Sequence, residues 1–189
     1  MKSNEAAVLI HASAVANGGV AFTLANTALG DTMLVTGLTL YMVRRLGKIY
    51  GVEDVAAKQI IGQCAAYYAG PYLTGKLLFW LPGVGNWANA ATTVLLTETI
   101  GWTCVSLFSS GRKPEDLSDD EWSDILKTAK KKAEEEQQKN KILLQKMTSE
   151  EKKEIKTIAK KLKDESIPDE EKEKLLESLK AFYKDIKNR

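Results

Sequence analysis

The stretch Ser110-Gly111-Arg112-Lys113-Pro114 divides this sequence into two segments of opposite character. Residues 1–110 contain only 11 of the 52 charged side chains, and residues 111–189 contain the other 41. All 13 glycines lie at or before Gly111. We therefore predict an apolar helical domain over 1–110 and a charged helical tail over 118–189, joined by a linker at 111–117.

The apolar segment contains long windows without a charged residue, and none of them sustains the alternation of a β-strand. This pattern favours helix throughout. Asp31 is a suitable N-cap, Gly51 is a suitable C-cap, and Gly70-Pro71 should kink or break a helix. The predicted fold class is all-α, a Gly/Ala-rich bundle of about four apolar helices followed by a charged amphipathic tail. The expected helices lie at about 6–26, 31–50, 53–81 and 87–108.

The tail carries local signals for helix starts. Ser118 with Glu121 and Thr148 with Glu151 both match the capping box, and Pro168 is typical of a first helical turn. We expect a helix over about 118–147 and then two short amphipathic helices, which pair as a hairpin because neither can bury its apolar stripe alone. The stripe of the last helix is the candidate interaction face of the tail: Leu175, Leu176, Leu179, Phe182, Tyr183 and Ile186.

The charge-free windows are long enough to raise the possibility of membrane spans, since a spanning helix needs about 20 apolar residues. Four spans would place Arg44, Arg45 and the tail on the same side, with no Lys or Arg in the short opposite loops. That arrangement fits the positive-inside rule with both termini cytoplasmic. Against it, Glu98 and Lys76 would each cost about 2.5–3.5 kcal/mol inside a span. A soluble helical core covered by the tail is the alternative.

Glu98 is the most informative ionisable residue of the apolar segment. A lone carboxylate in an apolar helix marks either an ion path or a buried pair, and the buried pair is favoured here. The expected partner is Lys76 or Arg44, so these three residues form the candidate buried ionisable set. The same helix carries an uncharged polar stripe that suits a buried seam between helices. Its members include Thr92, Thr93, Thr99, Thr103 and Ser106.

No catalytic residue, cofactor site or metal site is predicted. Residues 70–76 have the spacing of a phosphate-binding loop, but Leu77 stands where Ser or Thr would hold magnesium, so a kinked helix is preferred. His11 has no assignable nucleophile or acid beside it, and is expected to be a core histidine. Cys64 and Cys104 match no zinc pattern and are expected to be buried. The net charge of +2 gives no support for nucleic acid binding.

Two segments carry a family resemblance. One is residues 41–52, Tyr-Met-Val-Arg-Arg-Leu-Gly-Lys-Ile-Tyr-Gly-Val, and the other is residues 81–102, with Leu-Pro-Gly-Val-Gly-Asn-Trp-Ala-Asn-Ala-Ala-Thr and then Thr-Glu-Thr-Ile-Gly-Trp. Both resemble an uncharacterised bacterial helical domain of YcjF-like membrane proteins, which is also fused to some Era-like GTPases. The resemblance covers residues 1–110, mainly 30–105. It implies a bacterial source, membrane association and a GTPase neighbour, and it transfers no catalytic residues.

These observations predict a non-enzymatic, membrane-associated helical scaffold or adaptor. Its partners would be membrane lipid and a protein recruited by the cytoplasmic tail, either a GTPase or a second copy of the chain. The expected location is the bacterial inner membrane or its cytoplasmic face. Two alternatives stay open: an oligomeric channel lined by Glu98 and the threonine stripe, and a soluble, cytoplasmic, all-helical protein-interaction module.

Overall fold

The computed structural model describes residues 2–23, 32–52, 55–69 and 86–189. These residues contain seven α-helices and no β-strand, which confirms the predicted all-α class. Asp31, the expected break at Gly70-Pro71 and the phosphate-loop-like segment 70–76 lie outside the described residues. The helices are α1 (Lys2–Thr23), α2 (Thr32–Tyr50), α3 (Ala57–Ala69), α4 (Asn86–Ser109), α5 (Asp119–Lys146), α6 (Ser149–Lys163) and α7 (Asp169–Asn188).

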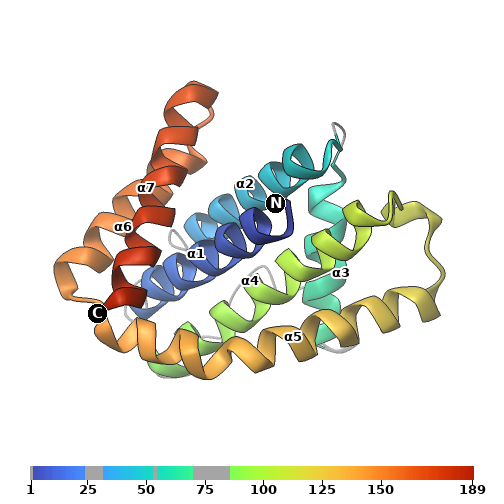
Figure 1. Ribbon diagram of the computed structural model, residues 1–189, viewed down its shortest axis with the longest axis horizontal. Coiled ribbons are helices and arrows are strands. Elements are labelled where there is room, and N and C mark those ends of the chain that lie inside the picture. The colour runs from blue at the N-terminus through green and yellow to red at the C-terminus, as the bar shows by residue number, and fades with distance from the viewer. Residues whose placement is uncertain (1, 24–31, 53–54, 70–85) are drawn as a thin grey trace.

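Helices α1 and α4 pack against each other in opposite directions at the centre of the molecule (Figure 1). The long helix α5 runs back along α4 in the opposite direction, and α3 also packs against α4. Helix α2 lies beside α1, and α6 and α7 form a pair that crosses α1. The charged tail is therefore wrapped around the apolar helices instead of extending away from them.

The predicted capping boxes set where the tail helices begin. The backbone N–H of Ser118 donates to Glu121 at 2.9 Å, and the N–H of Glu121 donates to the Ser118 hydroxyl at 3.4 Å. Thr148 and Glu151 exchange the same two hydrogen bonds at 2.7 and 3.2 Å. Gly51 follows α2 with a φ of 81°, as a left-handed C-cap requires. These starts and stops were predictable because each depends on residues within one turn.

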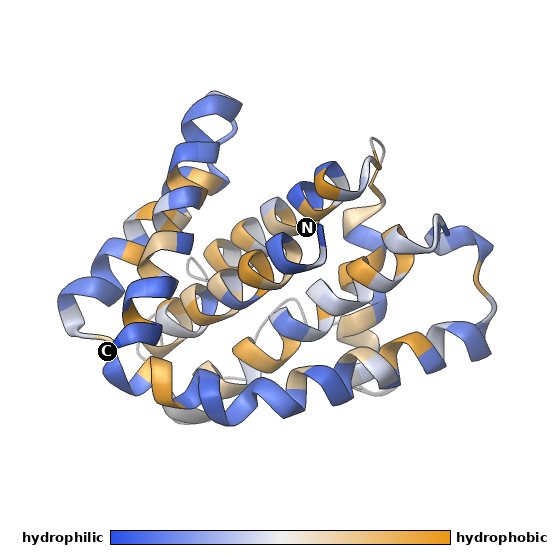
Figure 2. Cartoon of the chain, in the orientation of Figure 1, coloured by the Kyte–Doolittle hydropathy of each residue, from blue (hydrophilic) through white to orange (hydrophobic). Residues whose placement is uncertain are grey.

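The apolar segment and the tail share both hydrophobic clusters of the described residues. In one cluster, Ile10 and Leu107 pack with Trp122, Leu126 and Leu176 of the tail. The other cluster joins apolar residues of α1 and α2 to Leu144, Ile155, Leu179 and Ile186. Figure 2 shows that the hydrophobic positions of α5–α7 are turned toward the apolar helices and the hydrophilic positions outward. The tail therefore completes the core.

Three glycines of the apolar helices mark where the tail approaches most closely. A Cβ atom added at Gly18 would lie 3.0 Å from a methyl group of Leu144, and one at Gly19 would lie 2.6 Å from the methyl group of Met147. A Cβ atom at Gly37 would lie 2.9 Å from the Cβ atom of Lys163. Small residues permit close helix packing in membranes and in soluble bundles alike. Here they accommodate α5, the α5–α6 connection and α6.

Two helical segments of the described residues are long and apolar enough to cross a membrane, Lys2–Phe22 and Ala90–Ser109. They belong to α1 and α4, and most of each segment is buried by the rest of the chain. The core helices of a soluble protein pass the same test of length and composition. The four expected spans are therefore reduced to two candidates within the described residues, and both are covered.

Candidate functional site

Glu98 lies at the centre of a buried polar cluster that joins three helices. Its side chain has no exposed surface. The Nδ1 atom of His11, on α1, lies 2.7 Å from Oε1 of Glu98. Asn140, on α5, donates from Nδ2 to the same oxygen at 3.1 Å, and Trp102, one turn along α4, donates from Nε1 to Oε2 at 3.0 Å. Both carboxylate oxygens thus accept hydrogen bonds.

The donors around Glu98 explain how its buried oxygens are satisfied. The amide nitrogen of Asn140 and the indole nitrogen of Trp102 can only donate, so each needs an acceptor oxygen, and the Glu98 carboxyl group supplies both. A buried polar group is tolerated when it is hydrogen-bonded, and both oxygens of Glu98 meet that condition. Because Glu98 is fully enclosed, the arrangement is suited to holding α1, α4 and α5 together.

Aromatic and cationic side chains surround the pair. The His11 ring makes an edge contact with Trp102, with centroids 5.8 Å apart, and stacks on Tyr183 of α7 at 6.0 Å. Lys132 places its Nζ atom 3.4 Å from the centre of the Trp102 ring. Burial, with the nearby negative charges of Glu98 and Glu136, raises the pKa of Tyr183 to about 12. Helix α7 therefore also contributes to the cluster.

A second polar contact joins α1, α2 and α4. Asn17 donates from Nδ2 to the hydroxyl oxygens of Thr39 at 2.9 Å and Thr97 at 3.1 Å. Both hydroxyls in turn donate to the backbone carbonyl four residues earlier in their own helix. Thr93, Thr99 and Thr103 are also buried, whereas Thr92 and Ser106 are exposed. The buried part of the predicted stripe therefore lies in a seam between helices.

The expected partners of Glu98 were wrong or lie outside the described residues. Glu98 is buried, as predicted, but Arg44 is exposed near the end of α2, and Lys76 is not among the described residues. The residue that pairs with Glu98 is His11, which was expected to be a satisfied core histidine but was not connected to Glu98. Asn140 was also missed. The available signal for His11 was that it is a single histidine within an apolar helix. The available signal for Asn140 was that it is a lone Asn among lysines.

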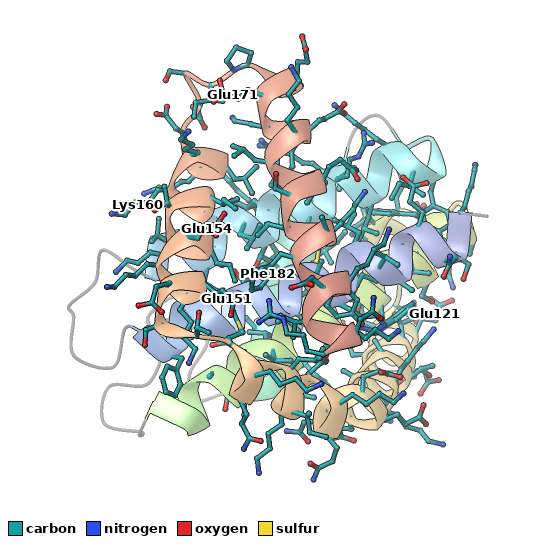
Figure 3. The ribbon with its side chains drawn as sticks, turned by 60° about the vertical axis from the view of Figure 1, so that its left-hand side comes forward. Glu121, Glu151, Glu154, Lys160, Glu171 and Phe182 are labelled. Atoms are coloured by element: carbon teal, nitrogen blue, oxygen red, sulfur yellow. The ribbon has the colours of Figure 1, made fainter. Side chains whose placement is uncertain are left out.

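The candidate interaction face of the tail is packed against the molecule's own core. Four of its six residues are buried in the two hydrophobic clusters, and Leu175 and Phe182 are partly buried against the second. In this conformation α7 lies on α1 and beside α6, so the candidate interaction face contacts the chain's own helices, and binding of a partner there stays a prediction. In Figure 3, Phe182 lies between α6 and α7, while Glu154 and Lys160 project outward from α6. The four buried residues are Leu176, Leu179, Tyr183 and Ile186.

Cys64 and Cys104 are both free and fully buried. Burial raises the pKa of the Cys64 thiol to about 12, and its Sγ atom lies 3.7 Å from the Thr103 hydroxyl. Both cysteines therefore behave as the small buried hydrophobes that the sequence predicts. The described residues hold no group of three or more His, Cys, Asp or Glu side chains placed to bind a metal ion.

Comparison of this chain with known protein families, curated proteins and solved structures gave no match. The resemblance to the helical domain of YcjF-like proteins therefore stays an expectation drawn from residues 41–52 and 81–102.

Proposed function

We propose that the chain is a non-enzymatic, membrane-associated helical adaptor whose charged tail covers its membrane-competent helices in water. The observation that supports this proposal is the enclosure of α1 and α4, the two helices long and apolar enough to span, by amphipathic helices α5–α7. The tail also packs closely against α1 and α2 at Gly18, Gly19 and Gly37. We call helices α5–α7 in this position the cover.

Insertion of α1 and α4 would require the tail to leave them. Helix α5 carries exposed charged residues along its outer face, such as Lys131, Glu135 and Lys141. Each charged side chain costs about 2.5–3.5 kcal/mol at the centre of a bilayer, so α5 would not follow α4 into lipid. The conformation described here is therefore a water-adapted, closed form, and the membrane-bound form is an open one.

Opening would also create the surface that recruits a protein partner. The stripe from Leu175 to Ile186 packs on α1 in the closed form and would be exposed once α7 leaves. A helix with such a stripe binds a hydrophobic groove or a second amphipathic helix. The proposed partner is a GTPase, as the family resemblance implies, or a second copy of the chain, at the cytoplasmic face of a bacterial inner membrane.

A reversible lock on the full chain tests this proposal. The Gly37→Cys and Lys163→Cys variant would tie α6 to α2, since a Cβ atom at Gly37 would lie 2.9 Å from that of Lys163 and a disulfide needs about 3.8 Å. Lys163 is the last residue of α6, so the bond requires a small displacement only at the end of that helix. The two native cysteines are buried and do not compete. We expect the reduced protein to float with phospholipid vesicles and the oxidised protein to stay in solution.

The Lys163→Cys variant alone is the matched control and should float equally well with and without reductant. Equal flotation of the oxidised and reduced double variant would contradict the cover model. If neither form floats, membrane association is contradicted and the soluble protein-interaction module becomes the better candidate. Such a module would also need its apolar helices to be covered by the tail. The channel alternative requires ion flux across vesicles that falls with Glu98→Gln.

A further inference from the structure

The end of α2 carries a basic patch that α7 covers with carboxylates. Tyr41, Arg45 and Lys48 are spaced by four and three residues and so share one face of the helix, with Arg44 exposed beside them. The Nη1 atom of Arg45 lies 2.7 Å from Oε1 of Glu173, and the Nζ atom of Lys48 lies 3.6 Å from Oδ2 of Asp169. The first turns of α7 thus neutralise this end of α2.

The carboxylates use only part of the binding capacity of the patch. Glu173 meets one terminal nitrogen of Arg45, while the buried Nε atom of Arg45 has no hydrogen-bond partner among the described residues. A guanidinium can bind two oxygens of a phosphate or carboxylate side by side. Tyr41 faces the same charges, since burial and then Glu173 raise its pKa and Arg45 opposes that rise. A group with more acceptor oxygens than Glu173 would satisfy Arg45 better.

The position of the patch points to lipid. Tyr, Arg and Lys at the end of an apolar helix are the residues that settle at a membrane interface, where the ring lies among headgroups and the cations meet phosphate. Exposed ion pairs such as Lys48–Asp169 contribute little, so a surface with many phosphates can displace them. The α7 carboxylates then act as an internal substitute for the anionic surface.

We infer that Tyr41, Arg44, Arg45 and Lys48 form a binding site for the phosphates of anionic lipid headgroups, which Asp169 and Glu173 mask in the closed form. The inference rests on the proposed membrane association and names the lipid class and the residues that meet it. In this inference α7 has two functions. Its apolar stripe packs on the core, and its carboxylates occupy the basic patch of α2 until the protein binds a membrane.

The test uses the full chain and flotation with two kinds of vesicle, phosphatidylcholine alone and phosphatidylcholine with phosphatidylglycerol. Removing the mask with Asp169→Asn and Glu173→Gln should raise binding to the anionic vesicles about ten-fold or more, since each freed cation contributes about five-fold. Binding to phosphatidylcholine alone should not change. Adding Arg45→Gln and Lys48→Gln to the unmasked variant should abolish the gain, and high salt should weaken it.

A matched control removes the same two charges elsewhere on α7. Glu170 and Glu177 pair within the helix with Lys174 and Lys180, at 2.8 and 2.7 Å, so Glu170→Gln and Glu177→Gln change the net charge equally and also free two lysines, but on α7 and with Arg45 and Lys48 still masked. An equal gain in this control would overturn the inference, and so would competition by soluble glycerol phosphate at the same phosphate concentration. Circular dichroism spectra and melting temperatures would confirm that every variant is folded.

The inference and the proposed function fail in different ways. If the reduced lock variant floats but does so equally with both kinds of vesicle, membrane association stands and the headgroup site is wrong. If the lock variant and the unmasked variant bind neither vesicle, both ideas fail together. If only the unmasked variant binds, the patch is a peripheral lipid site and insertion of α1 and α4 is wrong.

Discussion

The Nδ1 atom of His11 lies 2.7 Å from the Oε1 atom of Glu98, and this contact joins residues that are 87 positions apart. Glu98 is fully buried, and the same oxygen accepts a hydrogen bond from Asn140 of the tail. One carboxylate therefore connects the first helix, the fourth helix and the cover. The energetic consequence can be measured directly.

Replacing Glu98 with Ala should lower the free energy of unfolding by about 3–5 kcal/mol, because it leaves the buried N–H groups of Trp102 and Asn140 without their acceptor and removes the partner of His11. Glu98→Gln should cost less, because its amide oxygen can still accept one of these hydrogen bonds. Urea denaturation followed by far-UV circular dichroism measures both values. A loss below about 1 kcal/mol for Glu98→Ala would show that the cluster contributes little to stability.

Gly101 and Gly62 form a matched pair for testing the close packing of α1 on α4. A Cβ atom at Gly101 would lie 2.6 Å from Cγ1 and 2.8 Å from Cγ2 of Ile10, whereas one at Gly62 would meet nothing within 4 Å. Gly101→Ala should therefore destabilise the fold by about 1–3 kcal/mol through overpacking. Gly62→Ala should stabilise it by about 0.5–1 kcal/mol, because Ala favours the helix. Thermal unfolding of both variants is the measurement, and a gain at both sites would refute the close approach.

The protein should lose stability at alkaline pH through Tyr183. Its pKa is about 12 in the folded chain and 10.0 in the reference state, so the folded form holds the phenolic proton more strongly. The stabilisation is complete below pH 10 and is lost as the pH rises from 10 to 12. The difference corresponds to roughly 2–3 kcal/mol. Urea midpoints of the native chain and of Tyr183→Phe are measured between pH 9 and about 11.5, and the native midpoint should fall relative to that of the variant as the pH rises; parallel curves would argue against this role.

The thiol of Cys64 should report whether the core is closed. Its Sγ atom is fully buried and its pKa is raised to about 12, so very little reactive thiolate exists at pH 8. We expect a thiol reagent such as DTNB to react with Cys64 at a negligible rate in the native chain and rapidly in urea. The Cys104→Ala variant isolates the signal of Cys64. Fast reaction of that variant in its folded state would mean that α3 opens readily from α4.

The features that could be predicted from the sequence depend on neighbouring residues. Two capping boxes, Ser118 with Glu121 and Thr148 with Glu151, each form within a single turn. The starts of these helices could therefore be predicted from the local sequence. The apolar stripe of α7 was also visible, since helical periodicity shows which side of a helix avoids water. Periodicity does not show what that side will contact, and this is why the stripe was interpreted as a candidate face for a partner protein and not as part of the chain's own core.

The partner of Glu98 could not be predicted for the same reason. His11 and Asn140 are 87 and 42 positions away, and only the packing of α1 and α5 on α4 brings them to the carboxylate. Charge alone suggested Arg44 as a partner for an acid. Neutral donors such as Asn and Trp can also satisfy the oxygens of a buried carboxyl group, but they carry no charge by which a sequence would mark them.

The placement of Ile186 and Leu179 in the cluster that covers α1 sets an order of events during translation. Helix α1 leaves the ribosome before the tail helices, and the tail residues that complete its coverage follow more than 150 positions later. At 5–20 residues per second, α1 waits about 8–30 s without that part of its cover. Nascent chains thus present an incompletely covered hydrophobic helix, and under the proposed function this interval is when α1 could enter a membrane before the closed form exists.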